Sequence, residues 1–360
     1  MKIKKYTVHL FLSLAMLVIA SCKDPNTNAN HTCANTNYSA CTGTTTTYTS
    51  SKTVYTYPVG KAPEAIAIDA NGDLWITNYA GLGVSTVTKL SPSGITIGTY
   101  IVGSFQGNIA IDKNGDVWIV LVGDIDTVGN MVTKLAPSGD IIGTYQAGES
   151  PNAIAVDADN NIWIADGGGY YNAPGNILKL NSSGITIGTY PVGKNSAGIA
   201  IDACGNTWVT NLMSNNVTEL SPSGGTIGTY PANNGPDAIA IDSCGNVWVT
   251  NITSSTVTKL NASGVIVGTY QVGNTPEAIA VDSAGNIWVV NRGSNTITIL
   301  NSSGSILGTY SVGNSPRGIA IDASGNVWVT NSAITDSTVT EIVGAAKGPQ
   351  YWPYTGPQWP

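Results

Sequence analysis

Residues 278–291 read AIAVDSAGNIWVVN, and six further stretches of the chain follow the same pattern. These copies begin at residues 65, 108, 153, 198, 238 and 318. The repeated aspartates are Asp69, Asp112, Asp157, Asp202, Asp242, Asp282 and Asp322, spaced by 43, 45, 45, 40, 40 and 40 residues. Self-similarity at this period indicates a repeat architecture, in which each unit is one supersecondary element packed on its neighbours.

Each unit contains four short runs that favour β-strands. Ala-Ile-Ala-Ile comes first, and a Val-Trp-Val-Thr run follows after a D-x-x-G-N turn. Thr-Val-Thr-Lys-Leu and Ile-Ile-Gly-Thr-Tyr runs come next, separated by turns such as Ser-Pro-Ser-Gly. Runs of β-branched and aromatic residues between such turns predict hairpins, and four strands in about 40–45 residues match one propeller blade. The sequence therefore predicts an all-β, seven-bladed β-propeller over residues 53–343, with four antiparallel strands per blade.

The ends of the repeat region predict how the ring closes. A Thr-Tyr strand, TVYTY, stands at residues 53–57, before the first complete unit. After Asp322 the chain supplies only three strands, the last ending near Ile342. The N-terminal strand is expected to complete the last blade, which leaves the ring no open edge.

Every unit also carries one tryptophan at a fixed position. Burial of an aromatic side chain contributes about 1.5–3 kcal/mol, and repetition in phase favours packing between blades over ligand stacking. The aspartates have two interpretations as well. Asp69-x-Asn71-x-Asp73 resembles the start of a calcium loop but lacks the later bidentate glutamate. An aspartate that bonds backbone two residues on accounts for all seven copies. The repeated tryptophans are Trp75, Trp118, Trp163, Trp208, Trp248, Trp288 and Trp328.

The N-terminus has the features of an export signal. Residues 1–21 begin with lysines, continue with an apolar run and end in small residues, which is the order of a secretory signal peptide. Ile19-Ala20-Ser21-Cys22 resembles a bacterial lipobox, which implies cleavage before Cys22 and lipidation of its sulfur. An ordinary signal peptide is the alternative. Residues 22–52 are rich in Asn, Thr and Ser and are interpreted as a flexible tether. We expect an exported protein anchored to the bacterial cell envelope membrane by lipidated Cys22.

Four cysteines remain after Cys22, which favours an oxidising compartment. Cys204 and Cys244 occupy the same position in neighbouring units and are predicted to face each other and form a disulfide. Cys33 and Cys41 could close a small loop in the tether. Four cysteines allow three pairings, and unpaired buried thiols are a further alternative.

The units differ in length at one position only, the loop between the second and third strands. The longer versions, YAGLGVS, VGDIDTVGN and GGGYYNAPGN, lie in units 1 to 3. Insertions confined to one loop type put the variable chemistry on one face, often the binding face. Two rings are expected around the mouth of the axial channel on that face. The first lies five residues before each repeated aspartate: Glu64, Gly107, Asn152, Ala197, Asp237, Glu277 and Arg317. The second lies nine residues after it: Asn78, Leu121, Asp166, Asn211, Asn251, Asn291 and Asn331.

From these loops and rings we select candidate ligand-binding residues. Tyrosines offer a broad apolar face with a hydroxyl, and carboxylates on the same face offer acceptors. The alternative is that these loops only cover blade edges. The candidates are Glu64, Tyr79, Asp124, Asp126, Asp166, Tyr170, Tyr171, Asp237, Glu277, Arg292 and Arg317.

The motif G-I-A-I-D-x-x-G-N-V-W-V-T-N, preceded by Ser-Pro or Thr-Pro, resembles the streptogramin (virginiamycin) B lyase family and the related NHL-repeat propellers. The resemblance covers about residues 53–343 and implies a magnesium-assisted elimination that linearises a cyclic depsipeptide, with a histidine as base. This sequence departs from that pattern, because its only histidines are His9 and His31, both before the propeller.

Two functions of different class follow. The first is a lipid-anchored binding or scaffold propeller for a protein or a polar ligand such as a glycan or peptide, with no cofactor or metal. The alternative is a lyase or lactonase-like enzyme that uses carboxylates with Mg²⁺ or Ca²⁺. Nucleic acid is excluded as a partner, because the chain has 15 Lys and Arg against 22 Asp and Glu, a net charge of −7. The Pro- and Trp-rich tail, residues 344–360, is a further candidate for contact with a partner or with the propeller's own side.

Overall fold

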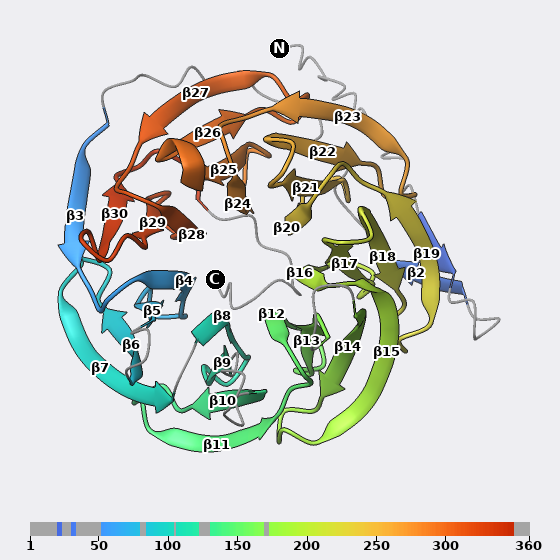
Figure 1. The fold of residues 1–360 in the computed structure, drawn as a ribbon, viewed down its shortest axis with the longest axis horizontal. Coiled ribbons are helices and arrows are strands. Elements are labelled where there is room, and N and C mark those ends of the chain that lie inside the picture. Colours follow the sequence, from blue (N-terminus) through green and yellow to red (C-terminus); the bar gives the residue numbers. More distant parts are fainter. Residues whose placement is uncertain are drawn as a thin grey trace, which may run out of the picture.

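The computed structural model describes residues 20–23, 30–33, 52–79, 84–103, 106–121, 130–168 and 173–348. Seven four-stranded antiparallel sheets stand as blades around a central axis (Figure 1). The predicted all-β, seven-bladed propeller is therefore confirmed.

Within each blade the strands run from the axis outward in chain order. The innermost strands are β4 (Pro63–Ile68), β8 (Gln106–Ile111), β12 (Pro151–Val156), β16 (Ser196–Ile201), β20 (Pro236–Ile241), β24 (Pro276–Val281) and β28 (Pro316–Ile321). The second strands are β5 (Leu74–Asn78), β9 (Val117–Leu121), β13 (Ile162–Asp166), β17 (Thr207–Asn211), β21 (Val247–Asn251), β25 (Ile287–Asn291) and β29 (Val327–Asn331). The third strands are β6 (Ser85–Leu90), β10 (Met131–Leu135), β14 (Pro174–Leu180), β18 (Asn216–Leu220), β22 (Thr256–Leu260), β26 (Thr296–Leu300) and β30 (Thr338–Ile342). The outermost strands are β7 (Thr96–Gly103), β11 (Ile141–Gln146), β15 (Thr186–Lys194), β19 (Thr226–Pro231), β23 (Ile266–Gln271), β27 (Ile306–Ser311) and β3 (Val54–Pro58).

The N-terminal strand closes the ring as predicted. β3 pairs antiparallel with β30, with Val54 opposite Ile342 and Pro58 opposite Thr338. The Tyr57 ring lies over the turn of blade 1, where a Cβ on Gly94 would meet it at 2.2 Å, and Gly94 has a φ of +75°. The strand thus completes blade 7 and packs on blade 1, so both sides of the seam depend on it.

The repeated aspartates shape the turn between the first and second strands. In each copy one carboxylate oxygen accepts the backbone N–H groups two and four residues on, as at Asp69. The other oxygen accepts the indole N–H of the tryptophan six residues on, over 2.9 to 3.2 Å in the seven blades. The seven tryptophans are at most 1% exposed. The turn interpretation of the aspartates and the packing interpretation of the tryptophans account for these contacts.

Each tryptophan also packs on a tyrosine of an outermost strand and, in four blades, under a lysine. The tyrosine and tryptophan ring centroids are 5.4 to 6.3 Å apart, including Tyr57 on Trp328. The lysine Nζ atoms lie 4.4 to 4.9 Å from the ring centroids of blades 1, 2, 3 and 5. Blades 4 and 7 have Glu219 and Glu341 at the same register position, opposite Trp208 and Trp328.

The antiparallel order of the strands divides the connections between two faces. The D-x-x-G-N turns and the turns between third and fourth strands lie on one face. The loops between second and third strands, and those leading into the next blade, lie on the other. The strand ends that flank the long loops of blades 1 to 3 therefore share a face with the start of every innermost strand.

The terminal segments have further structure. β1 (Ala20–Lys23) pairs antiparallel with β2 (Asn30–Cys33), in a stretch where the sequence predicts no strand. At the other end, Ala345 and Ala346 are buried in the core, and Gly348 O accepts the N–H of Ser283. The chain therefore continues to pack on the propeller beyond residue 343, while residues 349–360 of the predicted tail lie outside the described residues.

The cysteine predictions are tested in part. Cys204 and Cys244 both form disulfide bonds, which rules out unpaired buried thiols at these two positions. Their pairing with each other stays a prediction. Cys33 and Cys41 as a tether loop, and lipidation of Cys22, are not tested by the described structure. Within the described residues, no helix has the length and apolar composition needed to cross a membrane.

Candidate functional site

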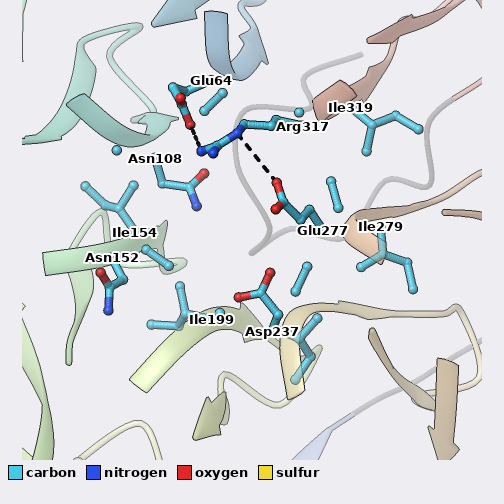
Figure 2. Close-up of a pocket in the computed structure, with 18 of the residues that line it drawn as sticks. Glu64, Asn108, Asn152, Ile154, Ile199, Asp237, Glu277, Ile279, Arg317 and Ile319 are labelled. Carbon is cyan, nitrogen blue, oxygen red and sulfur yellow. Dashed lines mark hydrogen bonds and ion pairs between the residues drawn. The ribbon is translucent and has the colours of Figure 1, made fainter. Parts of the chain in front are cut away.

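A cavity of about 430 Å³ opens on the axis, between the N-terminal halves of the innermost strands. It lies on the face that carries the long loops, because these strands begin there. Figure 2 shows charged and amide side chains, together with isoleucines, around this cavity. Seven strands converge on this cavity, so each blade contributes through the same two or three positions.

Charged side chains from blades 1, 6 and 7 form one ion-pair network at the mouth. Arg317 of β28 pairs through Nη1 with Glu64 Oε2, while its Nε lies 3.6 Å from Glu277 Oε2. Arg292, in the short 3₁₀ helix η2 (Arg292–Ser294), pairs with Glu277 Oε1 at 2.8 Å. Ser332 Oγ donates to Glu64 Oε1 over 3.3 Å. Arg317 therefore bridges blades 6 and 1 (Figure 2).

The ion pair with Arg317 opposes the effect of burial on the pKa of Glu64. Burial raises the pKa of Glu64 above its usual range, and the Arg317 charge and hydrogen bond act in the opposite direction. The same network has a structural role at the ring seam, because the Glu64 carbonyl also accepts Thr330 Oγ1 over 2.9 Å. Glu64 and Arg317 thus hold the mouth together as well as lining it.

Asp237 of β20 stands apart from this network. Its carboxylate points into the cavity from blade 5, with Glu277 of the next blade beside it (Figure 2). Burial and the negative charge of Glu277 raise the pKa of Asp237 to about 7, against the lowering effect of Arg317. Among the described residues, no side chain forms an ion pair or hydrogen bond with this carboxylate. The Asp237 carboxylate is therefore a hydrogen-bond acceptor available to a ligand in the cavity.

The structure brings together five of the predicted site residues: Glu64, Asp237, Glu277, Arg292 and Arg317. Tyr79 is half-buried at the end of β5, and its N–H bonds Ala62 O over 3.1 Å. Asp124, Asp126, Tyr170 and Tyr171 lie outside the described residues.

Asp166 is 4% exposed. Its Oδ1 accepts the N–H groups of Glu149, Ser150 and Gly168 over 2.7 to 3.2 Å. This carboxylate holds two loops of blade 3, so we leave it out of the proposed site.

The second predicted ring, nine residues after each aspartate, does not surround the mouth. Its five asparagines are at most 1% exposed, and Leu121 is 7% exposed. Each asparagine Nδ2 donates to a threonine oxygen of the third strand, as Asn251 does to Thr258 Oγ1 over 3.0 Å. The expected second ring was wrong because these side-chain amides lie inside the blade, where they donate hydrogen bonds to threonine hydroxyls of the neighbouring strand.

Sequence reasoning missed two contributors to the mouth. Asn108 lies one position further along β8 than the predicted ring, and Ser332 follows β29. Asn152 belonged to the ring but was not selected; its Nδ2 donates to Ser196 O over 2.8 Å. The signal for Asn108 was present in the repeat itself, since asparagine replaces the usual alanine or glycine there.

The described residues do not provide a metal site. No group of three or more His, Cys, Asp or Glu side chains lies within reach of one ion in the described part of the chain. At the mouth, Glu64 and Glu277 already pair with arginines. A divalent cation therefore has no ready set of ligands among these residues.

Fold and site together define a seven-bladed propeller with a charged axial pocket. The chain belongs to the virginiamycin B lyase family, which it matches over residues 52–339. A streptogramin B lyase structure is similar to it at 19% identity and a TM-score of 0.68, covering 80% of this chain and 96% of that one. A catalytically inactive virginiamycin B lyase from Staphylococcus aureus with quinupristin is similar at 18% identity and a TM-score of 0.70, covering 81% and 99%.

Hydrazine synthase from Kuenenia stuttgartiensis is similar at 15% identity and a TM-score of 0.68, covering 82% of this chain and 97% of that one. No curated protein matches the chain. At these identities the structural likenesses show the fold alone.

Proposed function

We propose that this chain is an exported, lipid-anchored propeller that binds a polar ligand or a protein partner at the mouth of its axial cavity. The observation that carries this proposal is the convergence of four charged side chains from four blades on one concave pocket, with Arg292 paired to one of them. A concave site with a few convergent polar groups is the usual form of a ligand-binding pocket. The positions that build it are those where the repeat varies, while the scaffold positions stay constant.

The long loops of blades 1 to 3 extend this site in our proposal. They lie on the same face as the pocket, so Tyr79, Tyr170 and Tyr171 would offer stacking surfaces and Asp124 and Asp126 further acceptors. A glycan or peptide suits such a surface, because both present apolar faces and many hydrogen-bond donors. Nucleic acid does not, given the acidic balance of the chain.

The test is a binding screen of glycans and peptides against the purified chain by calorimetry. A double variant, Tyr170→Ala with Tyr171→Ala, is expected to lose binding of any ligand found, with nearly the same melting temperature. Tyr55→Ala is a suitable control, because Tyr55 is exposed on the outermost strand β3, away from the pocket. Unchanged affinity in the double variant, or a ligand bound among the D-x-x-G-N turns, contradicts the proposal.

Lipid anchoring is the second part of the proposal and has its own test. Cys22 follows a signal-like segment and a lipobox-like sequence, and the disulfides at Cys204 and Cys244 suit an exported protein. Cys22→Ser is expected to abolish fatty-acid labelling and release the chain from the membrane fraction. Membrane retention of the unlabelled variant contradicts the anchor.

The alternative function is an elimination of the lyase type, and one observation favours it beyond family membership. Asp237 faces the pocket with a pKa of about 7, which suits a general base at neutral pH. In a β-elimination it would take a proton from the carbon beside the one bearing the leaving oxygen, as the carbon–oxygen bond breaks. Linearisation of quinupristin, assayed with Mg²⁺, with Ca²⁺ and with EDTA, tests this function. Activity that Asp237→Asn abolishes supports it, and no turnover under any of these conditions contradicts it.

A further inference from the structure

The charges at the mouth of the cavity do not balance. Glu64, Asp237 and Glu277 supply three carboxylates, and Arg292 and Arg317 supply two guanidinium groups. Both arginines pair with Glu64 or Glu277. The surplus negative charge therefore falls on Asp237, whose carboxylate points into the cavity (Figure 2).

This surplus charge is poorly solvated. Asp237 is partly buried, and its nearest charged neighbours are Glu277, which repels it, and the already paired Arg317. A carboxylate in such surroundings is stabilised by a cation that supplies both charge and hydrogen-bond donors. An isolated divalent ion would need several more oxygen ligands, and the described residues hold no such group.

Isoleucines supply most of the apolar part of the cavity lining. The alternate residue of each innermost strand is an isoleucine, and six of these seven line the cavity: Ile66, Ile154, Ile199, Ile239, Ile279 and Ile319. In Figure 2, Ile199 lies beside Asp237, and Ile154 and Ile279 lie further around the cavity. A ligand that reaches Asp237 therefore enters a cavity that aliphatic side chains also line.

We propose that the cavity binds an organic monocation whose charged nitrogen meets Asp237 and whose short aliphatic body lies against the isoleucines. A primary alkylammonium group has this chemistry, and so does the lysine side chain of a peptide. This inference rests on the proposed binding function and names the class of its ligand. An ammonium donates three hydrogen bonds, which suits one carboxylate with the Asn108 amide across the cavity.

The probes are a series of n-alkylamines from ethylamine to n-pentylamine, with n-pentanol as the neutral analogue, measured by calorimetry on the full chain. Each added methylene that becomes buried is expected to increase affinity about fourfold, from about 0.8 kcal/mol per methylene. The pentanol analogue is expected to bind at least about tenfold more weakly, because it leaves Asp237 uncompensated. Asp237→Asn and Asp237→Ser should both lose amine binding. Asp140→Asn is the matched control, since Asp140 is exposed on the opposite face and its carboxylate accepts a hydrogen bond from Ser138 Oγ, away from the cavity.

Amine affinity should also depend on pH through Asp237. Glu64, Glu277, Arg292 and Arg317 are the other charged groups facing it. With a pKa of about 7, protonation of Asp237 between pH 8 and pH 5.5 should weaken binding by roughly 30-fold. An Asp237→Asn variant should show no such change.

Several results overturn the inference. If pentanol binds as tightly as pentylamine, or if amine binding survives both Asp237 variants, the cavity does not select a cationic ligand. Displacement of pentylamine by Mg²⁺ or Ca²⁺ at millimolar concentration assigns the site to a metal ion instead. If amines fail but a neutral glycan or peptide binds in an Asp237-dependent way, the ligand class is wrong while the proposed binding function stands.

Discussion

Glu219 gives the sharpest prediction about stability, because it breaks the repeat at a buried position. Lysine occupies the equivalent place in blades 1, 2, 3 and 5, and in blade 3 Lys179 Nζ lies 3.2 Å from the repeated Asp157 and 4.4 Å from the Trp163 ring centroid. In blade 4 the side chain is a carboxylate, 5% exposed, that accepts Tyr230 Oη over 2.8 Å and Asn206 Nδ2 over 3.0 Å.

The pKa of the neighbouring repeated aspartate shifts in opposite directions in blades 3 and 4. Burial raises the pKa of Asp157, but hydrogen bonds from Trp163 and Asn161 and the charge of Lys179 bring it below its ordinary value. Burial leaves the pKa of Asp202 raised in blade 4. Burial and the charge of Asp202 also raise the pKa of Glu219 to about 7, from an ordinary 4.5.

The magnitude follows from that shift. A difference of about 2.5 pKa units corresponds to about 3 kcal/mol. Because the folded pKa lies above the unfolded one, the native state binds the proton more tightly, so stability is lost as pH rises from 4.5 through 7. The penalty is complete above pH 7 and absent below pH 4.5.

At pH 8 the free energy of unfolding of Glu219→Gln is expected to exceed that of the wild type by about 3 kcal/mol. This difference corresponds to a melting temperature roughly 6 °C higher. Glu219→Lys should gain at least as much, since its ammonium would lie between Asp202 and the Trp208 ring as in the other blades. The measurement is chemical unfolding of the wild type and both variants at pH 8 and pH 4.5. Equal stability of Glu219→Gln and the wild type at pH 8 refutes the reasoning, and so does a gain of the same size in this variant at pH 4.5, because its gain must come from ionisation of Glu219.

Three further predictions concern the scaffold. Asp322→Ala removes the acceptor of two backbone N–H groups and of the Trp328 indole N–H. Chemical denaturation should show a free energy of unfolding lower by about 2–4 kcal/mol. A decrease below about 1 kcal/mol would show that water replaces the carboxylate. Tyr57→Ala removes the half-buried ring by which β3 packs on Trp328 of β29 within blade 7 and should destabilise by about 1–3 kcal/mol; an unchanged melting temperature would mean that β3 does not hold the ring closed. Peptide mapping under non-reducing conditions should recover Cys204 linked to Cys244, and a fragment that links either to the tether would refute that pairing.

Much of the fold could be predicted because the sequence repeats its own constraints. One aspartate and one tryptophan, six residues apart, define the turn and core of every blade. A strand without a partner at each end of the repeat was enough to predict that Val54–Pro58 completes blade 7. Periodicity alone could not show which polar ring faces the axis. The ring at Asn251 was misplaced because an asparagine at the end of a strand has the same sequence pattern whether its amide faces solvent or, as here, bonds a buried threonine.

The site itself follows from where the repeat varies. At the ring five residues before each aspartate, blades 5, 6, 7 and 1 carry Asp237, Glu277, Arg317 and Glu64, while blades 2 to 4 carry glycine, asparagine and alanine. The mouth is therefore polarised, with charge on one side and small or amide side chains on the other. The strands that flank the long loops of blades 2 and 3 belong to the uncharged side. A ligand that reaches both parts must lie across the axis, with its charged end toward blades 5 to 7 and its polar body over blades 2 and 3. A chain molecule such as a peptide meets that requirement better than a compact one.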